Sequence, residues 1–213
     1  MHISDVCTIA FMTGLGERTG DGLPGGLPAT FSYSQARAGG LSDRRLYALR
    51  DAGLIEQLAR GLFRRADSSN EADSDLLEIA HRARQATLCL TSAMARHGLT
   101  DTIPATIDVA LPRGHRRPRT RAPVTWHAFA TDTFDVGRDD LALTAGTAIG
   151  LYGAERCIID AFRLRHLEGP ELAIEALRRW LRRRGSQPAT LVAMARVFPK
   201  AEPALRSALE ILL

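Results

Sequence analysis

The chain has 213 residues, 45% hydrophobic and 24% charged, with a formal net charge of +4. This composition is that of a globular protein of one or two domains with an apolar core, and it excludes a disordered or fibrous chain. No apolar run approaches the length of a membrane span, and residues 9–12 are too short for the core of a signal peptide, so we expect a soluble, cytoplasmic protein without a membrane partner.

The N-terminal 30 residues carry two weak patterns. Loose apolar periodicity predicts a helix over residues 1–15, and glycine-rich residues 14–26 predict a loop. The loop lacks the glycine and lysine spacing of a phosphate-binding motif, so it predicts no nucleotide cofactor. The three cysteines, Cys7, Cys89 and Cys157, lie far apart without zinc spacing, which indicates reduced, buried thiols and neither a metal nor any other cofactor.

Residues 31–65 have the order of a winged helix-turn-helix. A short helix over 32–38 is broken by Gly39 and Gly40, and Ser42 is placed to cap a second helix that runs through Arg50 and stops near Gly53. Residues 54–59 and 62–65 are strand candidates with a turn between them. In such a unit the second helix normally enters the DNA major groove.

Arginine dominates this unit and suggests how it would bind DNA. At about 100° per residue, Leu46 and Leu49 share the buried face of the second helix with Gly53. The second helix would bind or read the DNA major groove. The pair of strands, called the wing below, would hold phosphates. The expected DNA-binding residues are Ser42, Arg44, Arg45, Tyr47 and Arg50 on the helix, with Arg60, Arg64 and Arg65 on the wing. The alternative is an ordinary solvated helix and hairpin.

The polar, acidic residues 67–75 predict a linker between residues 1–66 and a second domain over residues 76–213. That domain alternates helical and strand patterns, so we expect an α+β fold in which a small mixed sheet packs with a C-terminal group of helices. The expected helices cover residues 75–86, 87–97, 154–167, 171–184, 187–198 and 203–213, and the expected strands cover 105–111, 124–129, 141–143 and 147–151.

A second basic patch lies in the proline-punctuated residues 112–123, between two expected strands. One interpretation is a contact with phosphate or RNA, or a docking loop for an acidic partner. The other is a solvated hairpin tip. The residues of the patch are Arg113, His115, Arg116, Arg117, Arg119 and Arg121.

Catalytic patterns are weak, and we expect no catalytic residue. Arg156 and Asp160 have the i, i+4 spacing of a helical ion pair, which would tie their helix to the preceding hairpin. Asp108 in a strand suggests a nuclease acid, but the only lysine, Lys200, lies far along the chain. Trp126 and Trp180 are expected to anchor the core.

Several segments after the winged unit resemble the AbiEi family, the antitoxins of type IV bacterial toxin–antitoxin systems, and the arginine-rich composition resembles mycobacterial members. They read CLTSAMARHGL, PATIDVALPRG, APVTWHAF and LYGAERCIIDAFRLRHLEGPELAIEALRRWLRRRG. The resemblance covers roughly residue 31 to the C-terminus and is most specific over residues 154–185. Relatives often have a clear first helix, which the glycine-rich region obscures here.

The resemblance implies a non-enzymatic antitoxin with two partners. Its N-terminal domain would repress its own operon by binding promoter inverted repeats in double-stranded DNA. Its C-terminal domain would neutralise a cognate nucleotidyltransferase toxin, by direct contact or indirectly. Two alternatives stay open: a winged-helix regulator whose second domain senses a ligand and meets no toxin, and an enzyme that modifies the toxin.

Overall fold

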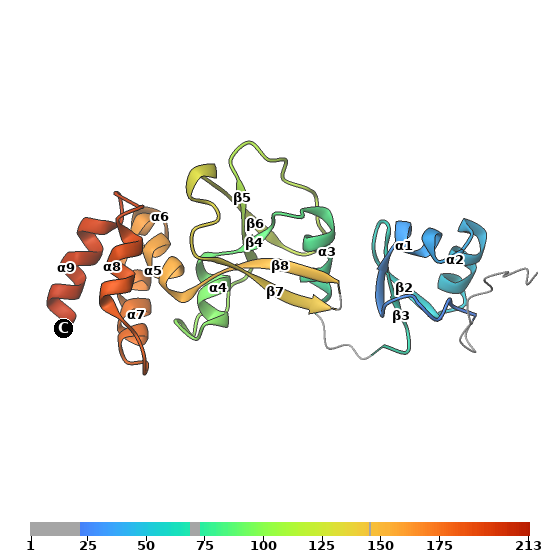
Figure 1. Ribbon diagram of the computed structural model, residues 1–213, viewed down its shortest axis with the longest axis horizontal. Helices are drawn as coiled ribbons and strands as arrows, with labels where there is room; N and C mark the ends of the chain where they lie inside the picture. The colour runs from blue at the N-terminus through green and yellow to red at the C-terminus, as the bar shows by residue number, and fades with distance from the viewer. Residues whose placement is uncertain (1–21, 69–72, 145) are drawn as a thin grey trace, which may run out of the picture. The chain divides into compact units, whose positions relative to one another are not determined.

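The computed structural model describes residues 22–68, 73–144 and 146–213, and the chain divides into two compact units, Met1–Ser69 and Asn70–Leu213 (Figure 1). The fold is α+β, with a winged helix-turn-helix in the first unit and a mixed sheet with helices in the second. The helix expected over residues 1–15 lies outside the described residues, as does most of the glycine-rich segment.

The first unit confirms the predicted pair of helices followed by a hairpin. Its elements in chain order are β1 (Thr30–Ser32), α1 (Tyr33–Ala38), α2 (Asp43–Asp51), β2 (Ile55–Ala59) and β3 (Leu62–Arg65). The strands form an antiparallel sheet in the order β1-β3-β2. The short strand β1 was not predicted. It forms because Phe31 pairs with Phe63 on β3, where their rings stack 5.9 Å apart in the core.

Local chemistry explains where these helices begin. Ser32 caps α1 in a capping box with Gln35. The Ser42 hydroxyl accepts a hydrogen bond from the Arg45 backbone N–H at 3.3 Å, as the sequence predicts. Between the helices, Gly40 has φ +84°, a conformation that glycine adopts without the steric cost of a side chain.

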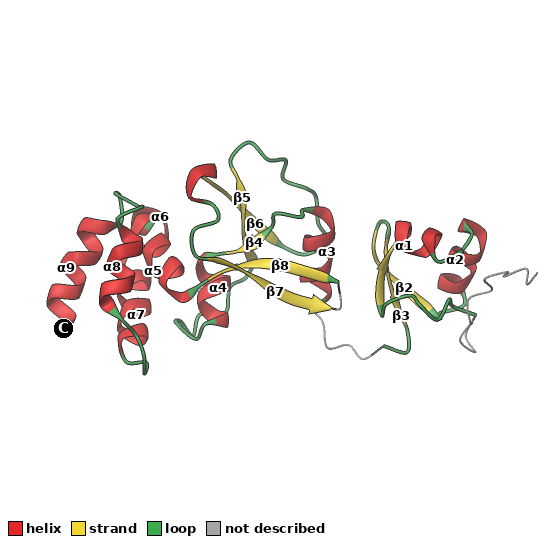
Figure 2. Cartoon of the chain, viewed as in Figure 1, coloured by secondary structure: helices red, strands yellow, loops and turns green. Residues whose placement is uncertain are grey.

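The second unit contains a five-stranded mixed sheet in the order β6-β5-β4-β8-β7 (Figure 2). The pairs β5–β6 and β4–β8 are parallel, whereas β4–β5 and β7–β8 are antiparallel. The strands are β4 (Thr87–Leu88), β5 (Ile107–Pro112), β6 (Val124–Phe129), β7 (Arg138–Thr144) and β8 (Thr147–Tyr152).

The helix predicted over residues 87–97 is wrong at its beginning. Thr87 and Leu88 form the central strand β4, paired with β5 on one side and β8 on the other, and α4 (Leu90–Arg96) follows only after Cys89. The chain turns sharply there, because Leu90 has φ +42°. The preceding helix, α3 (Ser74–Arg82), also ends four residues earlier than predicted, since Ala83 is extended.

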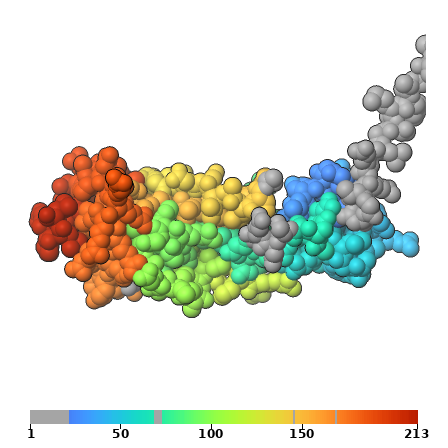
Figure 3. Space-filling model, turned by 90° about the horizontal axis from the view of Figure 1, so that it is seen from below, coloured from blue at the N-terminus to red at the C-terminus, as the bar shows by residue number. Residues whose placement is uncertain are grey.

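The C-terminal helices pack into one core with the sheet. The predicted helix over residues 154–167 is divided at Leu164 into two, and Trp180 is buried as expected, whereas Trp126 is only partly buried at the edge of the core. In the space-filling view α9 forms the red end of this unit beside the orange helices (Figure 3). The remaining helices are the short 3₁₀ helix Thr131–Thr133, α5 (Ala154–Arg163), α6 (Arg165–Glu168), α7 (Pro170–Leu181), α8 (Pro188–Ala195) and α9 (Glu202–Leu212).

A buried ion pair lies at the centre of the second unit. Arg156 Nε donates to Asp160 Oδ2 at 2.9 Å, and both side chains are almost fully buried. The predicted pairing is therefore confirmed. The guanidinium donates to the carbonyl oxygens of Thr133 and Val136, which precede β7, and lies 4.2 Å from the centre of the Tyr152 ring at the end of β8, so it ties α5 both to the hairpin and to the segment before it. Across the described residues, no helix has the length and apolar character that crossing a membrane requires.

Candidate nucleic-acid interface

Helix α2 turns one face to the core and the other to solvent. Leu46 and Leu49 are buried, and α2 joins α1 and the sheet through them. Arg44 and Arg45 are exposed near its N-terminus. Four of the residues expected to bind DNA therefore lie on α2, and Ser42 caps its N-terminus; all but Arg50 are exposed. The four on the helix are Arg44, Arg45, Tyr47 and Arg50.

Tyr47 and Arg50 form a small supported cluster on this helix. The Tyr47 ring, 40% exposed, meets Phe63 edge-on with centroids 6.4 Å apart. The Arg50 guanidinium lies 4.9 Å from the centre of the Tyr47 ring and donates to Asp51 and Gln57. Arg50 therefore positions the aromatic ring in addition to carrying charge.

The contact between α1 and α2 was not predicted from the sequence. The Tyr33 hydroxyl donates to Asp43 Oδ1 at 2.7 Å, and Arg37 Nη1 lies 3.4 Å from the same carboxylate oxygen. The hydrogen bond to Asp43 raises the pKa of the Tyr33 phenol above its ordinary value. These contacts join α1 to α2. A tyrosine and an acid ten residues apart give no periodic signal, because the turn between the helices alone brings them together.

The three wing arginines differ in their surroundings. Arg60 is exposed at the turn between β2 and β3. Arg64 is only 13% exposed and pairs with Glu56 at 2.7 Å, and Arg65 is only 15% exposed and pairs with Asp67 at 2.9 Å. Arg64 therefore joins β3 to β2, and of the three only Arg60 extends openly into solvent.

The second basic patch occupies a crossover, not a hairpin tip. Strands β5 and β6 are parallel neighbours, in register from Ile107 opposite Val124 to Pro112 opposite Phe129. The chain must therefore return along the sheet before entering β6, and it does so through a long irregular loop (Figure 2). The patch residues Arg113, His115, Arg116, Arg117, Arg119 and Arg121 are all exposed.

The side chains of the second unit that could suggest catalysis or metal binding are paired or buried. Asp108, considered above as a nuclease acid, lies 2.9 Å from His127 Nε2. Cys89 and Cys157 are buried free thiols, and burial raises the pKa of both. Within residues 22–68, 73–144 and 146–213, no group of three or more histidine, cysteine or acidic side chains is arranged to hold a metal ion.

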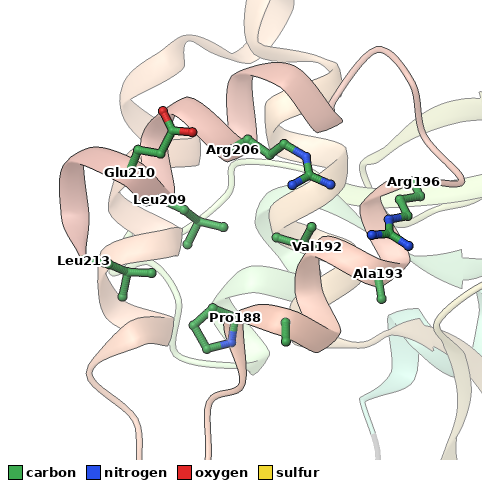
Figure 4. A pocket seen from close by; sticks show the side chains of 9 residues that line it. Pro188, Val192, Ala193, Arg196, Arg206, Leu209, Glu210 and Leu213 are labelled. Atoms are coloured by element: carbon green, nitrogen blue, oxygen red, sulfur yellow. The ribbon is translucent and has the colours of Figure 1, made fainter.

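A groove of about 450 Å³ lies between α8 and α9. Its walls are largely apolar, with Pro188 and Val192 from α8 and Leu209 and Leu213 from the C-terminal end (Figure 4). Arg206 at its edge is paired with Glu202. Such a surface can hold an apolar group, but these residues supply neither a nucleophile nor an acid–base pair.

The first unit is thus a winged helix-turn-helix module with an exposed, arginine-bearing second helix. Residues 29–66 match the family model described as "Transcriptional regulator, AbiEi antitoxin". The chain is also similar to the crystal structure of the RV2827C protein from Mycobacterium tuberculosis, with a TM-score of 0.50 and 19% sequence identity over 87% of this chain and 76% of that chain. At that identity the likeness concerns the fold. The comparison with curated proteins finds no match.

Proposed function

We propose that this protein is a transcriptional autorepressor and antitoxin that binds double-stranded promoter DNA through its first unit. One observation carries the proposal. The segment that matches the regulator and antitoxin family model, residues 29–66, is the segment that presents α2 with Arg44, Arg45 and Tyr47 exposed. A helix whose buried face packs on the core and whose exposed face carries arginines is suited to insertion into the major groove.

In this proposal each residue has a physical role. Ser42 fixes the first turn of α2, whose N-terminus favours nearby phosphate through the helix dipole. Arg44 and Arg45 reach base edges or phosphates, and Tyr47, held by Arg50, contacts the groove. Arg60 holds a phosphate from the wing.

Arg64 and Arg65 contact DNA only by exchanging a carboxylate for a phosphate, because Glu56 and Asp67 hold them in the free protein. Their part in binding is therefore weaker than that of Arg60, which extends into solvent.

The DNA-binding half is tested with the double variant Arg44→Ala plus Arg45→Ala in the full chain. Promoter affinity should fall, and the slope of log K against log salt should decrease by about two, since each phosphate contact contributes about 0.9. Fluorescence anisotropy with a labelled promoter duplex measures both quantities. The matched control is Arg182→Ala plus Arg184→Ala, two exposed arginines after α7. Unchanged promoter binding in the first variant would refute the assignment of α2.

The antitoxin half rests on the resemblance of residues 154–185 to AbiEi antitoxins and on the family description of residues 29–66. We propose that the second unit neutralises a nucleotidyltransferase toxin encoded beside it and that the promoter site contains inverted repeats. Co-expression of the neighbouring gene with and without this chain tests the pairing. Growth arrest that this chain does not relieve contradicts it.

A ligand-sensing regulator is the second candidate, favoured by the apolar groove between α8 and α9. It predicts a different outcome, because a small apolar ligand would then change promoter affinity while the neighbouring gene product would not affect growth. We further propose that the chain is not an enzyme, since Arg156 and Asp160, its most suggestive charged pair, are buried against each other in the core.

A further inference from the structure

We propose that the crossover loop, residues 113–121, is a second nucleic-acid site that binds the phosphate backbone of duplexes without reading their sequence. This goes beyond promoter recognition by α2, because the loop belongs to the second unit and would contact any duplex. The loop contains five arginines and one histidine, and residues 112–123 contain no acid.

The loop backbone is held in place, and the side chains of Arg113, Arg116, Arg117 and Arg119 are exposed to solvent. The Glu78 carboxylate is 2% exposed, and its Oε2 accepts the backbone N–H groups of Arg121 at 2.9 Å and Ala122 at 3.4 Å. At the other end the Arg113 N–H donates to the Phe129 carbonyl at 2.7 Å. A buried acid is thus used to fix a basic loop, so little ordering entropy is lost when the loop meets a ligand.

Four of the five loop arginines carry a charge that no acid among the described residues neutralises. Among the described residues Arg113, Arg116, Arg117 and Arg119 form no ion pair, unlike Arg64 and the other arginines that hold acids across the fold. Like charges gathered in one short loop repel one another, and no acid in the described part of the chain pairs with these four side chains. An anionic ligand along the loop would relieve it.

The shape of the loop favours a linear polyanion over a single small anion. From His115 to Thr120 the backbone has no helix or turn, and Pro118 disfavours the helical conformation at Arg117. A chain in the polyproline conformation advances about 3.1 Å per residue, which would put Arg117 and Arg119 about 6 Å apart. Along one DNA strand a charge recurs every 3.4 Å of helix axis or so, and arginine forks bind phosphate oxygens well.

The composition of the loop distinguishes duplex nucleic acid from the other acidic partners. A protein interface needs an apolar or aromatic centre, yet the exposed large apolar side chains of the described residues all lie elsewhere, for example at Ile103 and Leu167. Single strands are usually bound by aromatic side chains on which bases stack. A loop that has arginines but neither an apolar centre nor stacking aromatic rings is suited to contact the phosphate backbone of a duplex. Such contact does not depend on the base sequence.

The test uses the full chain and a labelled duplex of random sequence, with binding measured by anisotropy over a range of salt concentrations. The variant Arg116→Ala, Arg117→Ala, Arg119→Ala should weaken binding at least tenfold at about 0.1 M salt. Its log–log salt slope should fall by about 2–3, since three phosphate contacts are lost at about 0.9 each. The three-lysine variant at the same positions should keep most of the slope.

The control removes the same charge from another surface, by Arg178→Ala, Arg182→Ala, Arg184→Ala, all exposed on or after α7. A wild-type slope in the loop variant overturns the proposal, as does an equal loss in the control. Loss of single-stranded binding with duplex binding intact also overturns it, as does loss of a co-purifying protein with duplex binding intact. Adding the loop changes to the Arg44→Ala, Arg45→Ala protein separates the two sites, because the loop effect on random duplex should persist even if α2 proves not to bind DNA.

Discussion

Replacing Arg156 by methionine should destabilise the second unit strongly, although the residue touches no proposed ligand. Its side chain is 0% exposed, and it donates to Asp160 at 2.9 Å and to the carbonyls of Thr133 and Val136 at 2.7 and 2.5 Å. The guanidinium also lies 4.2 Å from the centre of the Tyr152 ring. The substitution removes one partner of a buried pair and the donors to two carbonyls.

The expected loss of unfolding free energy is about 3–5 kcal/mol, the range for breaking a buried ion pair. Arg163 remains 2.9 Å from Asp160, so the carboxylate keeps one partner, which moves the expectation toward the lower end. The matched control is Arg206→Ala, which breaks an exposed i, i+4 pair with Glu202 at 2.8 Å. Such pairs are worth about 0.3–0.5 kcal/mol, because solvent screens them.

Urea unfolding followed by tryptophan fluorescence suits this comparison, because the two tryptophans, Trp126 and Trp180, are both in the second unit. Stability changes are compared only where the dependence on urea concentration is unchanged. A loss below about 1 kcal/mol for Arg156→Met would refute the reasoning, because unpaired buried groups cost more than that. So would an equal loss for Arg206→Ala, since burial would then not be the cause.

Three further predictions concern local contacts. Ser42→Ala removes the cap of α2 and should lower the stability of the helix by about 1 kcal/mol. Hydrogen exchange of the α2 amides should then be roughly fivefold faster. Unchanged exchange contradicts the capping role. Asp43→Asn should lower the pKa of Tyr33 toward its ordinary value, since the ionised phenol no longer faces a carboxylate, and absorbance titration at alkaline pH measures the shift. Cys89 and Cys157 should resist a thiol reagent until denaturant is added, because burial raises both thiol pKa values; rapid labelling of the native protein at either site is the contrary result.

The winged unit was predictable because its signals are local. Ser42 and Gly53 mark the ends of one helix through capping and turn chemistry that involve only near neighbours. The strands that were missed depend on distant partners. Thr87 and Leu88 become strand because β5 and β8 lie on either side, and two residues are too few to show an alternating pattern. The strand that contains Phe31 was missed for the same reason, because it forms by pairing with Phe63 on β3.

The residues of the candidate site were easier to find than to interpret. Composition locates every arginine, but the charge of a side chain does not say whether an acid already holds it. Arg64 and Arg65 look like Arg60 in the sequence, yet the fold places carboxylates beside the first two. The anchor of the basic loop is equally hidden, because Glu78 lies 43 residues from Arg121.

The arginines of the protein consequently fall into two groups with different physical consequences. Arg156 is desolvated and held by Asp160 and backbone oxygens, so its charge serves stability and is unavailable to a ligand. Arg44 and Arg117 are solvated and exposed, so they add little to the fold and cost little to bring to a phosphate. DNA-binding strength should therefore depend on the exposed arginines of α2 and of the crossover loop and not on Arg156. Removing the buried Arg156 should lower stability without changing the salt slope of DNA binding, and removing Arg44 or Arg117 should lower the salt slope without changing stability.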